Sequence, residues 1–105
     1  MPDLLVSPAA RADLLAQWHN FALEVANLEL ADRYIQSVEQ TFGTLQRTPA
    51  IGPLYKTSNP KLRKLRSWRV DHFPNYLIFY RPLSDESRVE IVRVLHGLRD
   101  LQALL

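Results

Sequence analysis

The sequence of 105 residues contains no cysteine and only three glycines. Without cysteine the chain forms no disulfide bond and no thiolate metal site, which fits a reducing compartment. No apolar run approaches the roughly 20 residues needed to cross a bilayer, and the N-terminus lacks the cationic and apolar segments of a signal peptide. We therefore expect a cytoplasmic protein that consists of one domain, residues 1–105, and has no membrane partner.

Several catalytic classes are excluded by further absences. The three glycines are too widely separated to form a glycine-rich phosphate loop, and no serine lies in a nucleophile-elbow pattern. His19, His72 and His96 do not have the spacing of metal ligands. We therefore expect neither a metal site nor a cofactor.

Charge is distributed unevenly along the chain. Residues 1–50 contain three basic and six acidic side chains, whereas residues 51–105 contain ten basic and five acidic ones. The range Lys61–Arg69 contains five cations and no acidic residue. Ten of the 13 cations are arginines, which favour forked recognition of carboxylate or phosphate. The asymmetry predicts an anionic partner for the second half, either nucleic acid or an acidic protein surface.

Apolar residues spaced three or four apart predict two helices in the first half of the chain. Ser7 and Pro8 are typical of an N-cap and a first helical position, because the hydroxyl accepts a free N–H and proline has none to satisfy. Asn27 is suited to cap the second helix, which should end at Thr48-Pro49. The short connection makes the helices antiparallel, as a hairpin. The expected apolar stripes are Leu14, Leu15, Trp18, Phe21, Ala22 and Val25, then Ala31, Tyr34, Ile35, Val38, Phe42 and Leu45.

Strand-like periods flank this hairpin. The expected strands are Leu4–Val6, Leu65–Phe73, Tyr76–Arg81 and Val89–Leu95, with Phe73-Pro74-Asn75 as a turn. The last strand is apolar on both faces, so we place it at the centre of the sheet. The order β-α-α-β-β-β predicts an α+β, two-layer domain: an N-terminal strand, a helical hairpin, then a three-stranded antiparallel sheet.

Two runs in the second half resemble a known family. They are Phe73-Pro74-Asn75-Tyr76-Leu77-Ile78-Phe79-Tyr80-Arg81 and Val94-Leu95-His96-Gly97-Leu98-Arg99-Asp100. Together with Gly52-Pro53, Leu65-Arg66-Ser67-Trp68-Arg69-Val70 and the helix start Ser7–Leu14, they closely resemble the ParE branch of the ParE/RelE toxin superfamily. The resemblance covers nearly the whole chain and implies the RelE/ParE-like fold.

The resemblance implies the toxin of a bacterial type II toxin–antitoxin system. It implies a cytoplasmic protein held inactive by a ParD-like antitoxin, whose disordered C-terminal segment wraps the toxin in a complex that can be a higher-order oligomer. For the ParE branch it implies inhibition of DNA gyrase and growth arrest, with nucleic acid involved only indirectly. The RelE branch shares the fold but cleaves mRNA on the ribosome. A third possibility is a toxin fold retained only as a binding module.

The sequence argues against RNA cleavage, which is the alternative function. RelE-like toxins often place a tyrosine after the last strand, but no tyrosine follows His96 here. In this alternative, His96 would act as a general base while Arg81 and Arg93 face a phosphate. We expect instead that His96 caps the strand end through a backbone hydrogen bond and that the arginines pair with Glu90 or Asp100. We therefore expect that the protein is not an enzyme.

The basic strand predicts a partner surface. At an edge of the sheet, its open N–H and C=O groups can pair with an extended partner segment, and its charges also deter sheet aggregation. Trp68 is either an interface anchor or packs under the helices. Apolar residues around an expected short helix from Asp100 to Leu104 suggest an antitoxin groove or a dimer contact, or else pack on the sheet. The expected partner-binding residues are Arg63, Arg66, Trp68, Arg69, Leu98, Arg99, Leu101 and Leu104.

Overall fold

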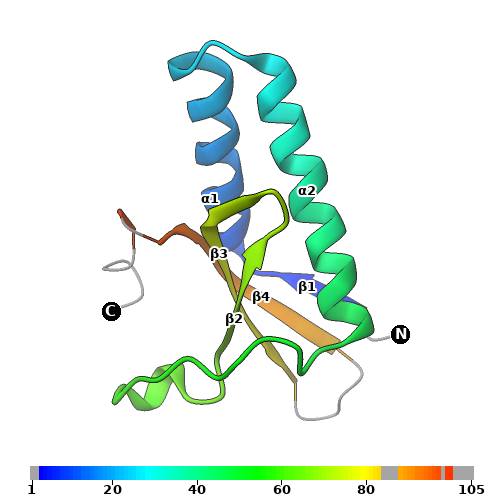
Figure 1. Cartoon of the computed structure of the whole chain (residues 1–105). Helices are drawn as coiled ribbons and strands as arrows, with labels where there is room; N and C mark the ends of the chain where they lie inside the picture. Colours follow the sequence, from blue (N-terminus) through cyan, green and yellow to red (C-terminus); the bar gives the residue numbers. More distant parts are fainter. Residues whose placement is uncertain (1–2, 84–87, 98, 101–105) are drawn as a thin grey trace.

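The computed structural model describes residues 3–83, 88–97 and 99–100. Its elements follow the predicted order of one strand, two helices and three strands (Figure 1). They are β1 (Asp3–Val6), α1 (Pro8–His19), a π-helical turn η1 (Asn20–Glu24), α2 (Leu28–Arg47), a 3₁₀ turn η2 (Pro60–Leu62), β2 (Arg66–Val70), β3 (Phe73–Pro82) and β4 (Arg88–His96).

The strands form one sheet in the order β1-β4-β3-β2. β4 pairs antiparallel with β3 and parallel with β1, so it is internal, as its apolar residues on both faces predict. The antiparallel part, β2-β3-β4, is the predicted three-stranded sheet, and β1 extends it by a parallel edge strand. The helices pack on one face of the sheet (Figure 1), which confirms the α+β, two-layer fold.

Both predicted helix N-caps are present. The side-chain oxygens of Ser7 and Asn27 accept hydrogen bonds from backbone N–H groups three residues further on, at 3.0 and 2.9 Å. α2 ends at Arg47, as the threonine–proline pair that follows predicts. Its predicted apolar stripe faces the sheet and is buried, apart from a half-buried Ile35.

The end of the first helix differs from the prediction. α1 stops at His19 and continues as the π-helical turn η1, in which the N–H of Val25 donates to the carbonyl of Asn20 at 3.0 Å. Each hydrogen bond of a π turn joins residues five apart, whereas those of an α-helix join residues four apart. Apolar residues spaced three or four apart therefore no longer all face the core in this turn. Val25 is therefore exposed, and Leu15 is exposed because it lies on the outer side of α1.

Ala26 adopts a left-handed backbone at the hairpin turn, with a φ of 56°. This conformation costs a residue with a Cβ roughly 1–2 kcal/mol, whereas glycine adopts it freely. Ala26→Gly is expected to raise the free energy of unfolding by about 0.5–1 kcal/mol in urea denaturation, because the relief exceeds the entropy lost on ordering glycine. Ala12→Gly, on an exposed face of α1, should instead lower it by about 1 kcal/mol. Equal destabilisation by both changes would contradict this account.

The predicted turn at residues 73–75 is wrong. Asp71 and His72 form the turn, His72 with a φ of 66°, and Phe73 already belongs to β3. The sequence favoured the later position because proline and asparagine are typical turn residues. Pro74 is tolerated within β3 because the register of the β2–β3 pairing shifts next to it, so its missing N–H breaks no ladder bond.

Apolar side chains fill both faces of the sheet. Between the helices and the sheet, Tyr34 and Ile78 are fully buried in the main core. On the opposite face, Phe79 and Leu95 are buried under the loop that precedes β2, which contributes Tyr55. This loop explains why β4 is apolar on both faces.

Candidate functional site

β2 lies at one edge of the sheet, but only part of that edge is open. The N–H of Ser67 donates to the carbonyl of Pro53 at 3.1 Å, and the N–H of Tyr55 donates to the carbonyl of Leu65 at 2.7 Å. The chain's own loop therefore takes the place of a further strand beside the start of β2. The open edge expected for a partner is limited to Trp68–Val70.

Arg66, one of the expected partner-binding residues, is tied to the same loop. Its Nη1 donates to the carbonyl of Gly52 at 2.6 Å. The N–H of Gly52 donates to the hydroxyl of Tyr80 at 2.9 Å, and that hydroxyl donates to the carbonyl of Pro49 at 2.8 Å. We call these four residues the Gly52 junction. Arg66 thus holds the loop on the sheet as part of the fold.

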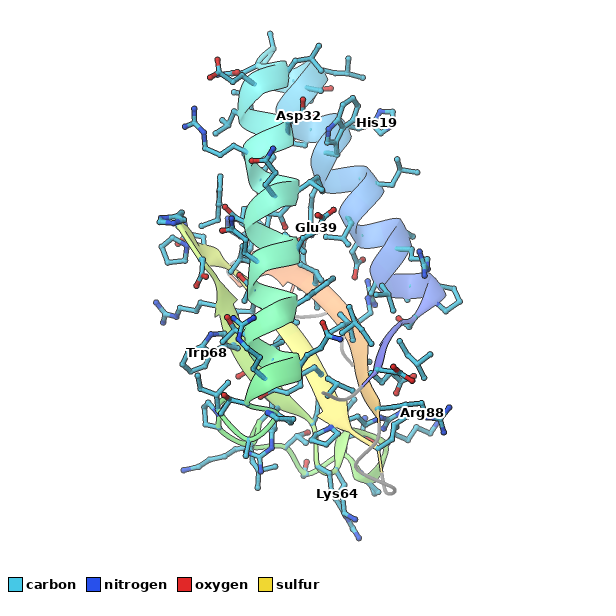
Figure 2. The ribbon with its side chains drawn as sticks, turned by 90° about the vertical axis from the view of Figure 1, so that its right-hand side faces the viewer. His19, Asp32, Glu39, Lys64, Trp68 and Arg88 are labelled. Atoms are coloured by element: carbon cyan, nitrogen blue, oxygen red, sulfur yellow. The ribbon has the colours of Figure 1, made fainter. Side chains whose placement is uncertain are left out.

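Exposed cations gather on this loop and on β2. Residues 50–70 contain no acidic side chain, and Figure 2 places Lys64 at the end of the molecule away from His19 and Asp32. The exposed cations are Lys56, Lys61, Arg63, Lys64 and Arg69, and we call them the cationic patch. Within the described residues, none of the five forms an ion pair.

A groove of about 600 Å³ runs along the open half of β2. The residues that line it come from β2, from the turn after β2, from β3 and from the loop before β2; they are Ser67, Trp68, Arg69, Val70, Asp71, His72, Leu77 and Pro53. The half-buried indole of Trp68 also packs against the main core. The packing of Trp68 under the helices is therefore confirmed in part, whereas its role as an interface anchor stays a prediction.

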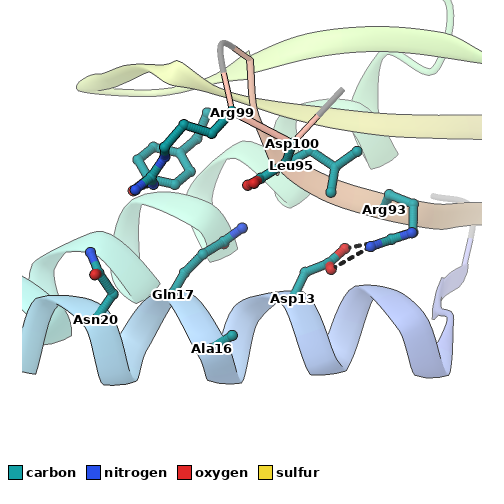
Figure 3. Close-up of a pocket in the computed structure, with 9 residues that line it drawn as sticks. Asp13, Ala16, Gln17, Asn20, Arg93, Leu95, Arg99 and Asp100 are labelled. Carbon is teal, nitrogen blue, oxygen red and sulfur yellow. Dashed lines mark hydrogen bonds and ion pairs between the residues drawn. The ribbon is translucent and has the colours of Figure 1, made fainter. Parts of the chain in front are cut away.

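A second hollow, a cleft of about 480 Å³, lies between α1 and β4 (Figure 3). β1 pairs only with the first half of β4, and polar side chains bind the backbone of β4 beyond it. Ser7 Oγ donates to the carbonyl of Val92 at 2.7 Å. At Val94, the carbonyl accepts from Gln17 Nε2 at 2.7 Å and the N–H donates to Asp13 Oδ2 at 3.0 Å. These side chains take the place of a strand partner.

Asp13 also binds Arg93 in this cleft (Figure 3). Nε and Nη2 of Arg93 donate to the two oxygens of the Asp13 carboxylate, each at 2.8 Å. This hydrogen bonding raises the pKa of the guanidinium, and the Asp100 carboxylate adds to the effect. The expected pairing of Arg81 with Glu90 is confirmed at 2.9 Å. For Arg93, however, the forked partner is Asp13 on α1, which the sequence did not single out.

The three residues of the alternative catalytic site do not share one cleft. Arg93 lines the cleft beside α1. His96 is paired with Tyr76 of β3, and Arg81 lies five residues further along that strand. Five residues of a strand correspond to about 17 Å. The ring of His96 packs edge-on against Tyr76, with centroids 5.1 Å apart. The N–H of His96 donates to Asp100 Oδ2 at 3.0 Å, which caps the strand end.

Arg99 is the one expected C-terminal contact that falls within the described residues. Its Nη2 donates to the hydroxyl of Tyr76 at 3.5 Å, and both residues line the cleft. Leu98, Leu101 and Leu104 lie outside the described residues, as does the expected helical turn beyond Asp100.

Asp13, Gln17 and Tyr76 were missed by sequence reasoning although they line the cleft. One signal was available for Gln17, which follows Leu14 by three residues and so lies on the stripe that faces the core. A polar side chain at such a position indicates a buried hydrogen bond. Asp13 and Tyr76 carry no such local signal, because their partners are distant in sequence.

Gln17 connects the cleft to the main core. Its Oε1 accepts a hydrogen bond from the buried hydroxyl of Tyr34 at 2.5 Å. Burial raises the pKa of this hydroxyl far above its usual range, and electrostatic repulsion from Tyr76 and Asp13 adds to the effect. The folded state therefore holds this proton more tightly than the unfolded state does.

The raised pKa of Tyr34 predicts how stability depends on alkaline pH. Its contribution is complete below about pH 10, where the unfolded tyrosine begins to ionise, and is lost as the pH rises further. Tyr34→Phe is expected to make the free energy of unfolding fall less steeply between about pH 9.5 and 11.5. Urea denaturation across this range measures the slope, with Tyr55→Phe as the control. An unchanged slope in Tyr34→Phe would contradict the assignment.

Within the part of the chain that the structure describes, no group of three or more histidine or acidic side chains is placed to hold a metal ion. The helices of that part are too short or too polar to span a membrane.

The sequence as a whole matches a known family. Residues 4–101 match the family described as "ParE toxin of type II toxin-antitoxin system, parDE". The protein is thus the toxin component of a type II toxin–antitoxin system. Within that class, the chain belongs to the ParE toxin family, as its sequence motifs and fold indicate. No match is found among curated protein sequences.

Solved structures with a similar fold come from toxin–antitoxin systems. The chromosomal ParDE system from P. aeruginosa superposes with a TM-score of 0.72 at 19% identity, covering 91% of this chain and 96% of that one. The RelBE2 toxin–antitoxin complex of Mycobacterium tuberculosis gives 0.62 at 24% identity, with 91% and 99% covered. The intact E. coli RelBE complex gives 0.57 at 13% identity, with 94% and 100% covered. At these identities the comparison establishes a shared fold.

Proposed function

We propose that this toxin arrests growth by binding DNA gyrase, without making or breaking a covalent bond. Membership in the ParE family supports gyrase as the target. The pairing of Arg93 with Asp13 supports a non-enzymatic role, because a guanidinium held by a carboxylate is a weak ligand for phosphate. The observation that carries the proposal is that Arg81, Arg93 and His96 do not converge in one cleft, which supports action by binding instead of catalysis.

We propose that a ParD-like antitoxin occupies the cationic patch and the groove along β2 and holds the toxin inactive. The similar solved structures come from toxin–antitoxin systems, which supports a partner of this kind. An extended acidic segment fits the geometry: its backbone can pair with the open edge at Trp68–Val70, and its carboxylates can bind Arg63 and Arg69. We propose that Arg99 also contacts the antitoxin, at the separate cleft between α1 and β4. Leu98, Leu101 and Leu104 stay predicted contacts outside the described residues.

The double variant Arg63→Ala/Arg69→Ala tests this surface. It is expected to weaken antitoxin binding about fivefold in calorimetric titration, because two exposed charge pairs are lost. Arg11→Ala/Arg47→Ala is the matched control, since both arginines are exposed on the helices, outside the patch. Equal affinities of the two double variants would contradict the placement of the antitoxin.

We propose that the toxin acts in the cytoplasm and that toxin and antitoxin assemble into a higher-order complex. A mass measurement on the purified complex tests the second point. A mass above that of one toxin with one antitoxin is expected, and a 1:1 complex would contradict it.

One observation favours RNA cleavage as a second candidate function. The hydroxyl of Tyr76 lies 3.5 Å from Arg99 in the cleft, so β3 supplies a tyrosine that the segment after β4 lacks. A tyrosine beside an arginine is a plausible proton donor and phosphate ligand. Under this candidate, Tyr76→Phe and Arg99→Ala should abolish cleavage of translated mRNA.

A supercoiling assay with purified gyrase separates the two candidates. The purified toxin is expected to block supercoiling at stoichiometric excess, the antitoxin should restore it, and translated mRNA should stay intact. Supercoiling that continues at excess toxin would reject gyrase as the target, and mRNA cleavage would reject the non-enzymatic mechanism. Normal growth on induced expression would indicate a fold retained only for binding.

A further inference from the structure

The helical hairpin ends in a tip that carries exposed apolar side chains. Leu23, Val25 and Leu28 are 68%, 52% and 60% exposed, and they lie where α1 and η1 turn into α2. In Figure 1 this tip projects beyond the sheet, at the end of the molecule away from η2. Three large apolar side chains, each more than half exposed within one turn, are typical of an interaction site.

The charges around the tip are opposite in sign to those of the cationic patch. Glu24, Glu29 and Asp32 border the apolar side chains, and Figure 2 places Asp32 and His19 at this end of the molecule. Arg33 is the only basic residue between positions 20 and 46, and its guanidinium pairs with Glu29 at 3.5 Å. The tip therefore complements an apolar hollow bordered by cations.

The tip has a fixed shape before any partner binds. Trp18 Nε1 donates to Asp32 Oδ1 at 3.2 Å and links the two helices. The N–H of Asn27 donates to the carbonyl of Phe21 at 3.1 Å and closes the turn, while the Phe21 ring packs against Tyr34, with centroids 5.1 Å apart. A surface that is ordered in advance loses little conformational entropy on binding.

Charge decides between the occupants of this tip. A second copy would bring two acidic rims together, and three side chains bury far less than the roughly 1,200 Å² of a stable interface between copies. An acidic antitoxin segment would be repelled. An enzyme that binds DNA carries cationic surfaces, because it must neutralise phosphates. The acidic rim would steer the tip toward such a surface.

We propose that the hairpin tip, formed by Leu23, Val25 and Leu28 with its acidic rim, is the surface that contacts gyrase. The inference rests on the proposed function and assigns the two ends of the molecule to different partners. The cationic patch binds the antitoxin and the tip binds the target. An antitoxin bound at the patch then acts by excluding the much larger target sterically.

The double variant Leu23→Ser/Leu28→Ser tests the proposal. The toxin concentration that half-inhibits supercoiling is expected to rise at least about tenfold, as for residues that anchor an interface. Leu15→Ser is the control, since this leucine is 61% exposed on α1 but lies outside the tip and the cationic patch, and it should change inhibition by less than about twofold. Both variants should keep the wild-type melting temperature and antitoxin affinity.

Each outcome of this experiment bears on the tip. The proposal would be overturned if the tip variant half-inhibits supercoiling at the same concentration as the wild-type toxin. It would also be overturned if the variant loses antitoxin binding or self-association to the same extent as it loses inhibition. If the wild-type toxin leaves gyrase active, the proposed target fails, and growth arrest on induced expression then tests the tip by itself. A folded, antitoxin-binding tip variant that no longer arrests growth supports the tip as the target surface, whereas one that still arrests growth overturns it.

Discussion

Asp13→Ala is expected to lower the free energy of unfolding by about 3 kcal/mol. The carboxylate of Asp13 accepts three hydrogen bonds, two from the guanidinium of Arg93 and one from the N–H of Val94. The side chains of the ion pair are 12% and 25% exposed, so water reaches them poorly. Removal of the carboxylate leaves a largely buried charge and a strand N–H without this acceptor, and α1 loses a main attachment to β4.

Urea denaturation measures this loss, and two further variants locate its cause. Asp13→Asn keeps an acceptor for the N–H of Val94 but not the charge for Arg93, so it should lose about half as much stability. Glu39→Ala removes an exposed carboxylate of α2 and should change stability by less than about 0.5 kcal/mol. The account is wrong if Asp13→Ala is as mild as Glu39→Ala.

Gly52→Ala is expected to destabilise the fold by about 2–3 kcal/mol through overpacking. A Cβ at this position would lie 2.5 Å from the carbonyl oxygen of Ser67 and 2.8 Å from the hydroxyl of Tyr80. The first of these is backbone of β2, which cannot rotate away as a side chain can. The loop must therefore lift from the sheet and strain the Gly52 junction. Since the cationic patch lies on this loop and on β2, antitoxin affinity should fall as well.

Gly43→Ala is the matched control for this prediction and should act in the opposite direction. Gly43 lies within α2, where a Cβ would meet only the flexible end of Arg47, 3.3 Å from its Nη1. Alanine in a helix interior is favoured over glycine by about 1 kcal/mol, so stability should rise by that amount. Thermal and urea unfolding of both variants check the signs. If the stability of both variants shifted in the same direction, the close contact between position 52 and the backbone of β2 would not be what requires glycine there.

Features specified by neighbouring residues were predictable from the sequence. Ser7-Pro8 and Asn27 cap their helices as predicted, because capping depends on groups within one helical turn. The central place of β4 follows from its apolar residues on both faces. The π-helical turn and the Asp71-His72 turn were not predictable, because packing selects them over stronger local signals such as Pro74-Asn75.

The candidate site was likewise predictable from the sequence only in part. The cations of the patch were apparent from composition, because no acidic residue interrupts them. The restraint of Arg66 by Gly52 was not, and neither was the pairing of Arg93 with Asp13, whose residues are 80 positions apart. Such contacts depend on how distant elements meet. A charge pattern therefore predicts which residues are basic, but not which of them the fold itself uses.

The parallel pairing of β1 with β4 has a consequence for synthesis of the toxin. Asp3 pairs with Arg88 and Val6 with Ile91, so the first strand finds its partner only after residues 88–91 have left the ribosome. Contacts this distant in sequence slow folding, because a long loop must close before they form. A nascent chain halted before residue 88 has no β4 against which β1 can dock. The assembled fold thus arises only once β4 has been synthesised.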